Sequence, residues 1–182
     1  MITAGIYLKY GNRFAFMFGP NKENTHHGVV RFGGHIDHGE SDVECALREV
    51  REEANVGVAL SDCPKTYYVR QRDAPPSVAD GFEHSEPRPI LISGGTKASP
   101  SAATFVGSTE ETPVPSMETR GILFLTLGEI NRICAGEVSL HQFIESNGQF
   151  VEKERLDRQL RLVPYLQLRF LQWAIDHNVV HA

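Results

Sequence analysis

The stretch that decides the fold runs from Gly34 to Val56 and reads GHIDHGESDVECALREVREEANV. Ser41 is followed three residues later by Glu44, the spacing of a capping box, in which each side chain satisfies a backbone N–H of the first helical turn. Asn55 tolerates the left-handed conformation that is common just after a helix, so the helix should end there. Its buried face is predicted from apolar residues at steps of three and four, namely Val43, Ala46, Leu47, Val50 and Ala54.

Short apolar runs precede this helix and predict strands. Residues 3–9 and 13–18 are rich in Ile, Tyr, Phe and Leu, and a Tyr-Gly-Asn turn separates them, which is typical of a hairpin. Residues 28–32 predict a third strand that stops at Gly33-Gly34. The following loop then leads into the helix, so the sequence predicts an order of strand, loop and helix.

The part of the chain after the helix predicts further strands, two long loops and more helix. Strands are expected at residues 65–72, 89–93 and 121–126, and helices at 127–134, 139–145 and 153–177, the last interrupted by Pro164. Residues 73–88 and 94–116 are rich in Pro, Ser, Thr, Gly and Ala and predict long loops. Such loops are unusual in a compact domain and suggest mobile segments or lids over a site.

Length and composition predict one globular domain spanning residues 1–182. The chain has 41% hydrophobic and 23% charged residues, close to the average of soluble proteins. Its formal net charge of -5 argues against a nucleic-acid coat or a polybasic membrane anchor. No stretch approaches the roughly 20 apolar residues of a membrane span. The N-terminus does not resemble a secretory signal, so a cytoplasmic location is expected.

Three glutamates share one face of the predicted helix. Glu49 lies three residues before Glu52 and four before Glu53, so their carboxylates converge. Magnesium prefers oxygen ligands and usually combines one or two carboxylates with water and substrate phosphates. The simpler reading is a solvated acidic face, because like-charge pairs on an exposed helix cost only about 0.2 to 0.5 kcal/mol each. The acidic face alone does not decide between the two.

Residues outside the acidic face favour a metal site over a solvated acidic face. The segment resembles the signature of the Nudix hydrolase family: Gly, five residues, Glu, seven residues, then Arg-Glu-apolar-any-Glu-Glu-any-Gly-apolar. The matching positions are Gly34, Glu40, Arg48, Glu49, Val50, Glu52, Glu53 and Val56. Eight matches at fixed spacing would arise by chance on the order of once in a million. One position departs, with Asn55 where the family has Gly.

The resemblance implies a fold and roles for several residues. The expected fold is α/β, a Nudix-like α/β/α sandwich with a mixed sheet, long loops after residue 73 and a C-terminal helical segment. Glu52 and Glu53 would be metal ligands, and Glu49 a ligand or the base. The backbone carbonyl of Gly33 could add an oxygen, while Arg48, paired with Glu40, would orient the carboxylates.

For further site residues the sequence offers several candidates and leaves the choice among them open. Many family members place another Glu before a late strand, and Glu118 is the candidate; the competing residues are Glu83, Glu86, Glu110 and Glu111. Arg31, Arg70 and Arg72 could meet substrate phosphates, and Tyr68 or Phe32 could stack on a base, although each is also an ordinary strand residue.

The implied activity is metal-dependent cleavage of a diphosphate linkage in a nucleoside diphosphate derivative, by attack of a metal-activated water on phosphorus. Mg2+ is the expected cofactor, with Mn2+ as a substitute. The expected partner is a small nucleotide or diphosphate substrate rather than a membrane or bulk nucleic acid; a homodimer is an option, and the sequence leaves the oligomeric state open. The alternative is a catalytically weak relative that binds a nucleotide or a partner protein as a sensor.

Overall fold

The structure is a computed structural model and describes residues 1–71, 74–82, 86–136 and 138–180. Its centre is the hairpin of β1 (Thr3–Tyr10) and β2 (Arg13–Pro20), joined by a turn in which Gly11 has a φ of 58°. Strand β9 (Ala102–Thr109) runs parallel to β1 along its whole length. On the other side of the hairpin, β10 (Gly121–Leu125) and β11 (Gln149–Glu152) extend the sheet.

Shorter strands complete the sheet. Strands β8 (Leu91–Ser93), β6 (Tyr67–Val69) and β7 (Ser77–Val78) continue it beyond β9, where β5 (Ala59–Ser61) also pairs. Strand β4 (Phe32–His35) pairs with β1, whereas β3 (His27–Val30) pairs with β2 and with β12 (Leu162–Pro164). Parallel and antiparallel pairs both occur, so the sheet is mixed, as predicted.

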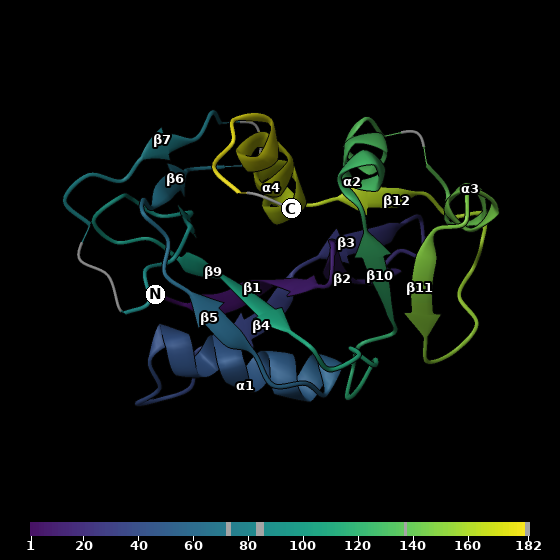
Figure 1. Cartoon of the computed structure of the whole chain (residues 1–182), viewed down its shortest axis with the longest axis horizontal. Coiled ribbons are helices and arrows are strands. Elements are labelled where there is room, and N and C mark those ends of the chain that lie inside the picture. Colours follow the sequence, from purple (N-terminus) through teal and green to yellow (C-terminus); the bar gives the residue numbers. More distant parts are fainter. Residues whose placement is uncertain (72–73, 83–85, 137, 181–182) are drawn as a thin grey trace.

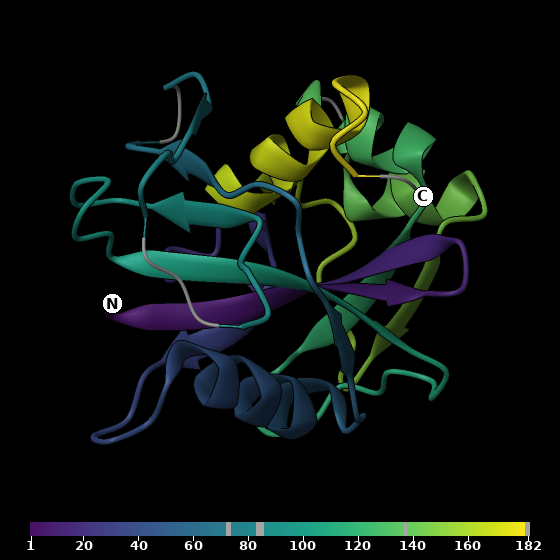
Figure 2. The ribbon, with the colours of Figure 1, turned by 60° about the vertical axis from the view of Figure 1, so that its left-hand side comes forward.

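Helices cover both faces of the sheet (Figures 1 and 2). Helix α1 (Asp42–Ala54) packs against β1 and β4 on one face. The other face carries α2 (Leu127–Cys134) and α4 (Leu166–Asp176), with α3 (Leu140–Glu145) beside them. Two apolar cores result, one on each face of the sheet. The α/β/α sandwich expected from the sequence is confirmed.

Several predicted elements differ from the structure. The segment 94–116 is not a single long loop, because β9 lies within it. Its run Ala-Ala-Thr-Phe-Val-Gly-Ser-Thr is poor in large apolar residues, yet the strand has β1 and β8 as neighbours and packs at the centre of the sheet. The strand expected at 65–72 is reduced to β6, and the short strands β5 and β7 were not predicted.

The C-terminal region contains less helix than predicted. Within the helix predicted at 153–177, residues 162–164 form a strand and helix begins only at Leu166, and a strand at 149–152, before that range, was not predicted. Pro164 therefore ends a strand instead of interrupting a helix. In the part of the chain that the structure describes, no helix is both long and apolar enough to span a membrane.

Candidate active site

Helix α1 has the ends that its sequence predicts. The Ser41 hydroxyl accepts a hydrogen bond from the Glu44 backbone N–H at 3.2 Å, and the Glu44 carboxylate accepts one from the Ser41 backbone N–H at 2.9 Å. Asn55 follows the helix in the left-handed conformation, with φ 54° and ψ 39°. Asn is among the few residues other than Gly that adopt this conformation readily. The departure from the family signature at Asn55 therefore leaves the helix end intact.

Arg48 ties the glycine loop to the helix. Its Nε and NH2 atoms donate to the two carboxylate oxygens of Glu40 at 2.8 and 3.0 Å. A further hydrogen bond runs from Arg48 to the His35 carbonyl oxygen at 3.0 Å. Because Arg48 and the Asp37 backbone N–H both donate to Glu40, the pKa of that carboxyl falls to about 2. The loop is thus anchored by the ionised Arg48–Glu40 pair, which is joined by two hydrogen bonds.

The same guanidinium also orients two glutamates of α1. Arg48 NH1 donates to Glu49 Oε1 at 2.7 Å and to Glu52 Oε2 at 3.3 Å. Four donated hydrogen bonds to three carboxylates leave Arg48 little freedom to turn. Arg48 therefore holds these carboxylates in place and does not face a ligand with a free guanidinium.

Gly34 allows the loop to approach the Glu49 carboxylate closely. A Cβ atom at position 34 would lie 2.3 Å from Glu49 Oε1 and 2.6 Å from Oε2, well inside van der Waals contact. The requirement for glycine in the signature thus has a local cause in this chain: any side chain at 34 would occupy the space of the Glu49 carboxylate.

We expect Gly34→Ala to lower turnover about tenfold or more while leaving the fold intact, because the new methyl group displaces the end of a flexible side chain rather than backbone. The measurement is kcat together with the thermal unfolding temperature. Gly128→Ala is the control, since a Cβ there would meet nothing within 4 Å. A Gly34→Ala enzyme as active as wild type would contradict the close approach.

Glu53 is the buried member of the acidic cluster. Glu53 is only 7% exposed, and its Oε2 atom accepts a hydrogen bond from the Gly33 backbone N–H at 2.8 Å. The pKa of this carboxyl is raised to about 8, mainly by burial and also by the neighbouring Glu49 and Glu118 charges, whereas the Gly33 hydrogen bond and Arg31 act in the opposite direction. Repulsion among carboxylates is therefore built into the site.

Glu53 and Glu118 meet in one groove. This groove, of about 280 Å³, lies between the end of β2, the start of β3, α1 and the segment before β10. Its lining residues are Met17, Phe18, Gly19, Pro20, Asn21, Gly28, Val30, Glu53, Glu118, Thr119, Arg120 and Tyr165. The competing glutamates Glu86, Glu110 and Glu111 do not line it, and Glu83 lies outside the described residues.

A divalent cation fits the chemistry of these donors. Among the described residues, no three His, Cys, Asp or Glu side chains form a ready-made metal site. Mg2+ does not need such a cage, because it usually takes one or two carboxylates and fills its other positions with water and substrate phosphates. The available donors are carboxylate oxygens, and a cation beside Glu53 would offset the repulsion from Glu49 and Glu118.

The predicted substrate residues do not gather at the groove. Arg31 is buried, and its guanidinium donates to Thr104 Oγ1 at 2.9 Å and to backbone carbonyl oxygens nearby. Tyr68 donates its hydroxyl to the Gly95 carbonyl oxygen at 2.9 Å. Arg70 is exposed just beyond β6, and Arg72 lies outside the described residues.

Arg31 also explains why the strand predicted at 28–32 is divided. The chain pairs with β2 up to Val30 and with β1 from Phe32, so it changes partner at Arg31. Strand structure then continues through Gly33 and Gly34 to His35 instead of stopping at the glycines. A Cβ at Gly5 or Gly33 would lie about 2 Å from the Arg31 guanidinium, at 1.9 and 2.1 Å respectively. These glycines make room for a buried arginine beneath the loop.

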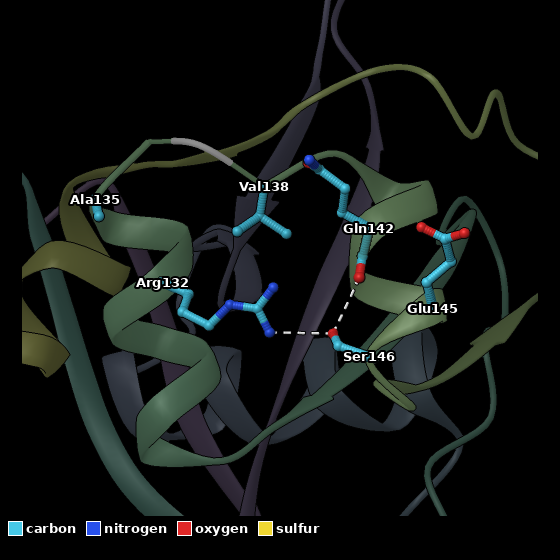
Figure 3. A pocket seen from close by; sticks show the side chains of 6 residues that line it. All are labelled: Arg132, Ala135, Val138, Gln142, Glu145 and Ser146. Atoms are coloured by element: carbon cyan, nitrogen blue, oxygen red, sulfur yellow. Dashed lines mark hydrogen bonds between the residues drawn. The ribbon is translucent and has the colours of Figure 1, made fainter.

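A second cavity, of about 470 Å³, lies between α2 and α3 (Figure 3). Its arginine, Arg132, donates to the Ser146 hydroxyl at 3.1 Å, and Ser146 in turn donates to the Gln142 carbonyl oxygen. One carboxylate, Glu145, lines it. This cavity contains none of the predicted site residues, so we place the candidate active site at the groove beside α1.

Cys45 does not have the environment of a nucleophile. The residue is fully buried in the core under α1, and burial raises the pKa of its thiol to about 11. A thiol with this pKa stays protonated at neutral pH and is a poor nucleophile. Cys45 therefore serves as a small packing residue in the core under α1.

An α/β/α sandwich with a glycine loop clamped to a glutamate-bearing helix is the arrangement that the resemblance to Nudix-type pyrophosphohydrolases implied. The family model described as "NUDIX domain" matches residues 10–89, which include the whole of the loop and α1. By this match, residues 10–89 form a NUDIX domain. A search of curated proteins finds no match.

Solved structures with low sequence identity share the fold. A NUDIX-family hydrolase from Clostridium perfringens is 17% identical with a TM-score of 0.50, covering 71% of this chain and 82% of its own. A possible asymmetric diadenosine tetraphosphate hydrolase from Jonesia denitrificans is 10% identical with a TM-score of 0.54, covering 97% of this chain and 93% of its own. The second match extends the fold similarity beyond residues 10–89 to nearly the whole chain.

Proposed function

We propose that this chain is a metal-dependent hydrolase that cleaves the diphosphate linkage of a nucleoside diphosphate derivative, with Mg2+ as cofactor and Mn2+ as a substitute. The observation that carries the proposal is that Glu53 of α1 and Glu118 from the segment before β10 line one groove. A solvated acidic face would not need a buried carboxylate, a second carboxylate from a distant segment, or a glycine loop held by Arg48.

The residues have separate tasks. Glu52 and Glu53 would hold the cation, and Glu49, oriented by Arg48, would be a further ligand or the base. When bound, the cation neutralises charge on the phosphate oxygens and lowers the pKa of the attacking water. Glu118 is exposed at the groove and would accept the proton of the attacking water.

The positioning groups act through these carboxylates. The Gly33 backbone N–H fixes one oxygen of Glu53 at 2.8 Å, so the other oxygen has a defined direction. Arg48 keeps the loop and the helix at a constant separation through Glu40. Little reorganisation is then required when the substrate binds, which is how a preorganised site lowers the barrier.

The experiment is to incubate the purified protein with Mg2+ or Mn2+ and a panel of nucleoside di- and triphosphates, nucleotide sugars and dinucleotides, and to identify the products. We expect turnover of at least one nucleoside diphosphate derivative, with two phosphate-containing products, and no turnover in EDTA. A protein that binds a nucleotide but turns over no member of the panel is the sensor of the alternative hypothesis, and that result would overturn the proposal.

A further inference from the structure

Tyr165 closes one side of the groove. Strand β12 runs parallel to β3, with Val163 opposite Gly28, and leads directly to the start of α4 (Figure 1). The Tyr165 side chain comes back over β3: a Cβ at Gly28 would lie 2.9 Å from Tyr165 Oη and 3.0 Å from Cζ. The absence of a side chain at Gly28 therefore gives the tyrosine ring its place beside the groove.

The ring is held in place but left open to solvent. Tyr165 is 37% exposed, and it is the aromatic member of the exposed large apolar side chains in the described ranges. The His26 ring meets it in a T-shaped contact with 6.4 Å between centroids. Its hydroxyl makes no hydrogen bond to another described residue. A supported, partly exposed aromatic ring at the wall of a groove is suited to stacking.

The groove joins this ring to the acidic cluster. Glu53 and Glu118 line it together with Tyr165, while Met17 and Pro20 give it apolar walls. Its volume of about 280 Å³ is near the lower end of the range for small-molecule sites, about 300 to 1,000 Å³. The groove has room for one ring system next to the reacting phosphates, and a second one would extend into solvent.

Three polar side chains of the groove, those of Asn21, Thr119 and Arg120, have partners within the protein. The Asn21 amide donates to Glu23 and Thr25 and accepts from the Thr25 backbone N–H. The Thr119 hydroxyl donates to the Met17 sulfur, and Arg120 forms an ion pair with Glu154. Since these side chains already have partners, we expect a ring in the groove to be recognised chiefly by its face.

We propose that Tyr165 is the substrate-binding residue on which the planar base stacks while the diphosphate lies at Glu53, so that it selects for substrates that carry a base. This assignment rests on the proposed function and adds to it the way the substrate is selected. Because the ring is recognised by its face, the groove should accept purine and pyrimidine diphosphate derivatives with similar affinity. The sequence-based candidates for stacking, Tyr68 and Phe32, are replaced by a residue far along the chain.

The test compares two ligands that cannot be hydrolysed. The α,β-methylene analogue of ADP carries a base, and methylene diphosphonate presents the diphosphate alone. Affinities are measured by calorimetry with Mg2+ for wild type, Tyr165→Leu and Tyr165→Phe. We expect Tyr165→Leu to weaken the nucleotide about tenfold, in line with the roughly 1–3 kcal/mol of base stacking, and to leave methylene diphosphonate unchanged. Tyr165→Phe, which keeps the ring, should bind both ligands as wild type does.

Kinetics on a substrate from the panel give a second readout. Tyr165→Leu should raise KM about tenfold with kcat nearly unchanged, because stacking acts on a part of the substrate away from the reacting phosphorus. The methylene analogues of UDP and GDP should bind within about tenfold of the ADP analogue.

The outcomes separate the two proposals. Equal nucleotide affinity in wild type and Tyr165→Leu would overturn the role of Tyr165, even if the enzyme hydrolyses its substrate. A loss of both ligands in Tyr165→Leu would also overturn it, since it would mean general damage to the groove. One base bound a hundredfold more tightly than the others would overturn recognition by the face. A wild type without turnover of any panel member contradicts the proposed function, while the calorimetry still tests stacking.

Discussion

Glu53→Gln should lower turnover about a hundredfold or more, because it removes the buried negative charge that we assign to the cation. The side-chain amide keeps an oxygen that can accept the Gly33 N–H, so the loop geometry should survive. The measurement is kcat at saturating Mg2+. Glu110→Gln is the matched control, because Glu110 is exposed and does not line the groove. Equal loss in both variants would contradict the assignment.

The same variant should have the opposite effect on stability. The pKa of Glu53 is about 8 in the folded protein, against an ordinary value of 4.5. Between these pH values the folded state keeps a proton that the unfolded state has lost, so the metal-free wild type loses stability as pH rises from about 4.5 to 8. Gln does not titrate. In EDTA, Glu53→Gln should therefore gain unfolding temperature relative to wild type at pH 8.5 but not at pH 5. A pH-independent difference would contradict the raised pKa.

The second large effect is expected at Arg48. Arg48→Met removes the donors to Glu40, Glu49 and Glu52 together, and we expect turnover to fall about 10- to 100-fold, the usual effect of removing a residue that orients metal ligands. Arg48→Lys should rescue little, because an ammonium group cannot bond both oxygens of Glu40 in the same fork geometry.

Arg51→Met is the control for Arg48→Met, since Arg51 lies on the same helix and is exposed. The measurements are kcat and the Kd for Mg2+, determined by calorimetry. Arg48→Met should lower kcat and raise the Kd for Mg2+, while Arg51→Met should change neither. If Arg48→Lys restored full activity, a single positive charge would suffice and the bidentate clamp would not be the cause.

Local sequence information predicted the part of the site that lies on one helix. The capping box at Ser41 and the buried stripe of α1 follow from residues close in sequence, and the resemblance implied the Arg48–Glu40 pair; the structure shows each of them. Asn55 was the one departure from the family pattern, and its left-handed conformation explains why it is tolerated. Spacing along a helix translates directly into geometry, which is why this part was accessible.

The parts that the sequence did not reveal depend on long-range packing. Strand β9 has few large apolar residues, and only its position between β1 and β8 makes it central. In the sequence, Arg31 resembles an exposed strand residue. The structure shows that Gly5 and Gly33 make room for its buried guanidinium. Tyr165 reaches the groove because β12 pairs with β3, and nothing near Tyr165 in sequence signals that pairing.

The groove also determines how the site forms during folding. Its walls come from residues as distant in sequence as Met17 and Tyr165, whereas the glutamates of α1 belong to one local helix. Contacts of such long sequence separation carry a large loop-closure cost and slow folding. A fragment limited to residues 10–89 would contain the acidic helix but lack β1, β9, Glu118 and Tyr165. We therefore expect the chain to become enzymatically active only when the whole fold has formed, because formation of α1 alone does not complete the groove.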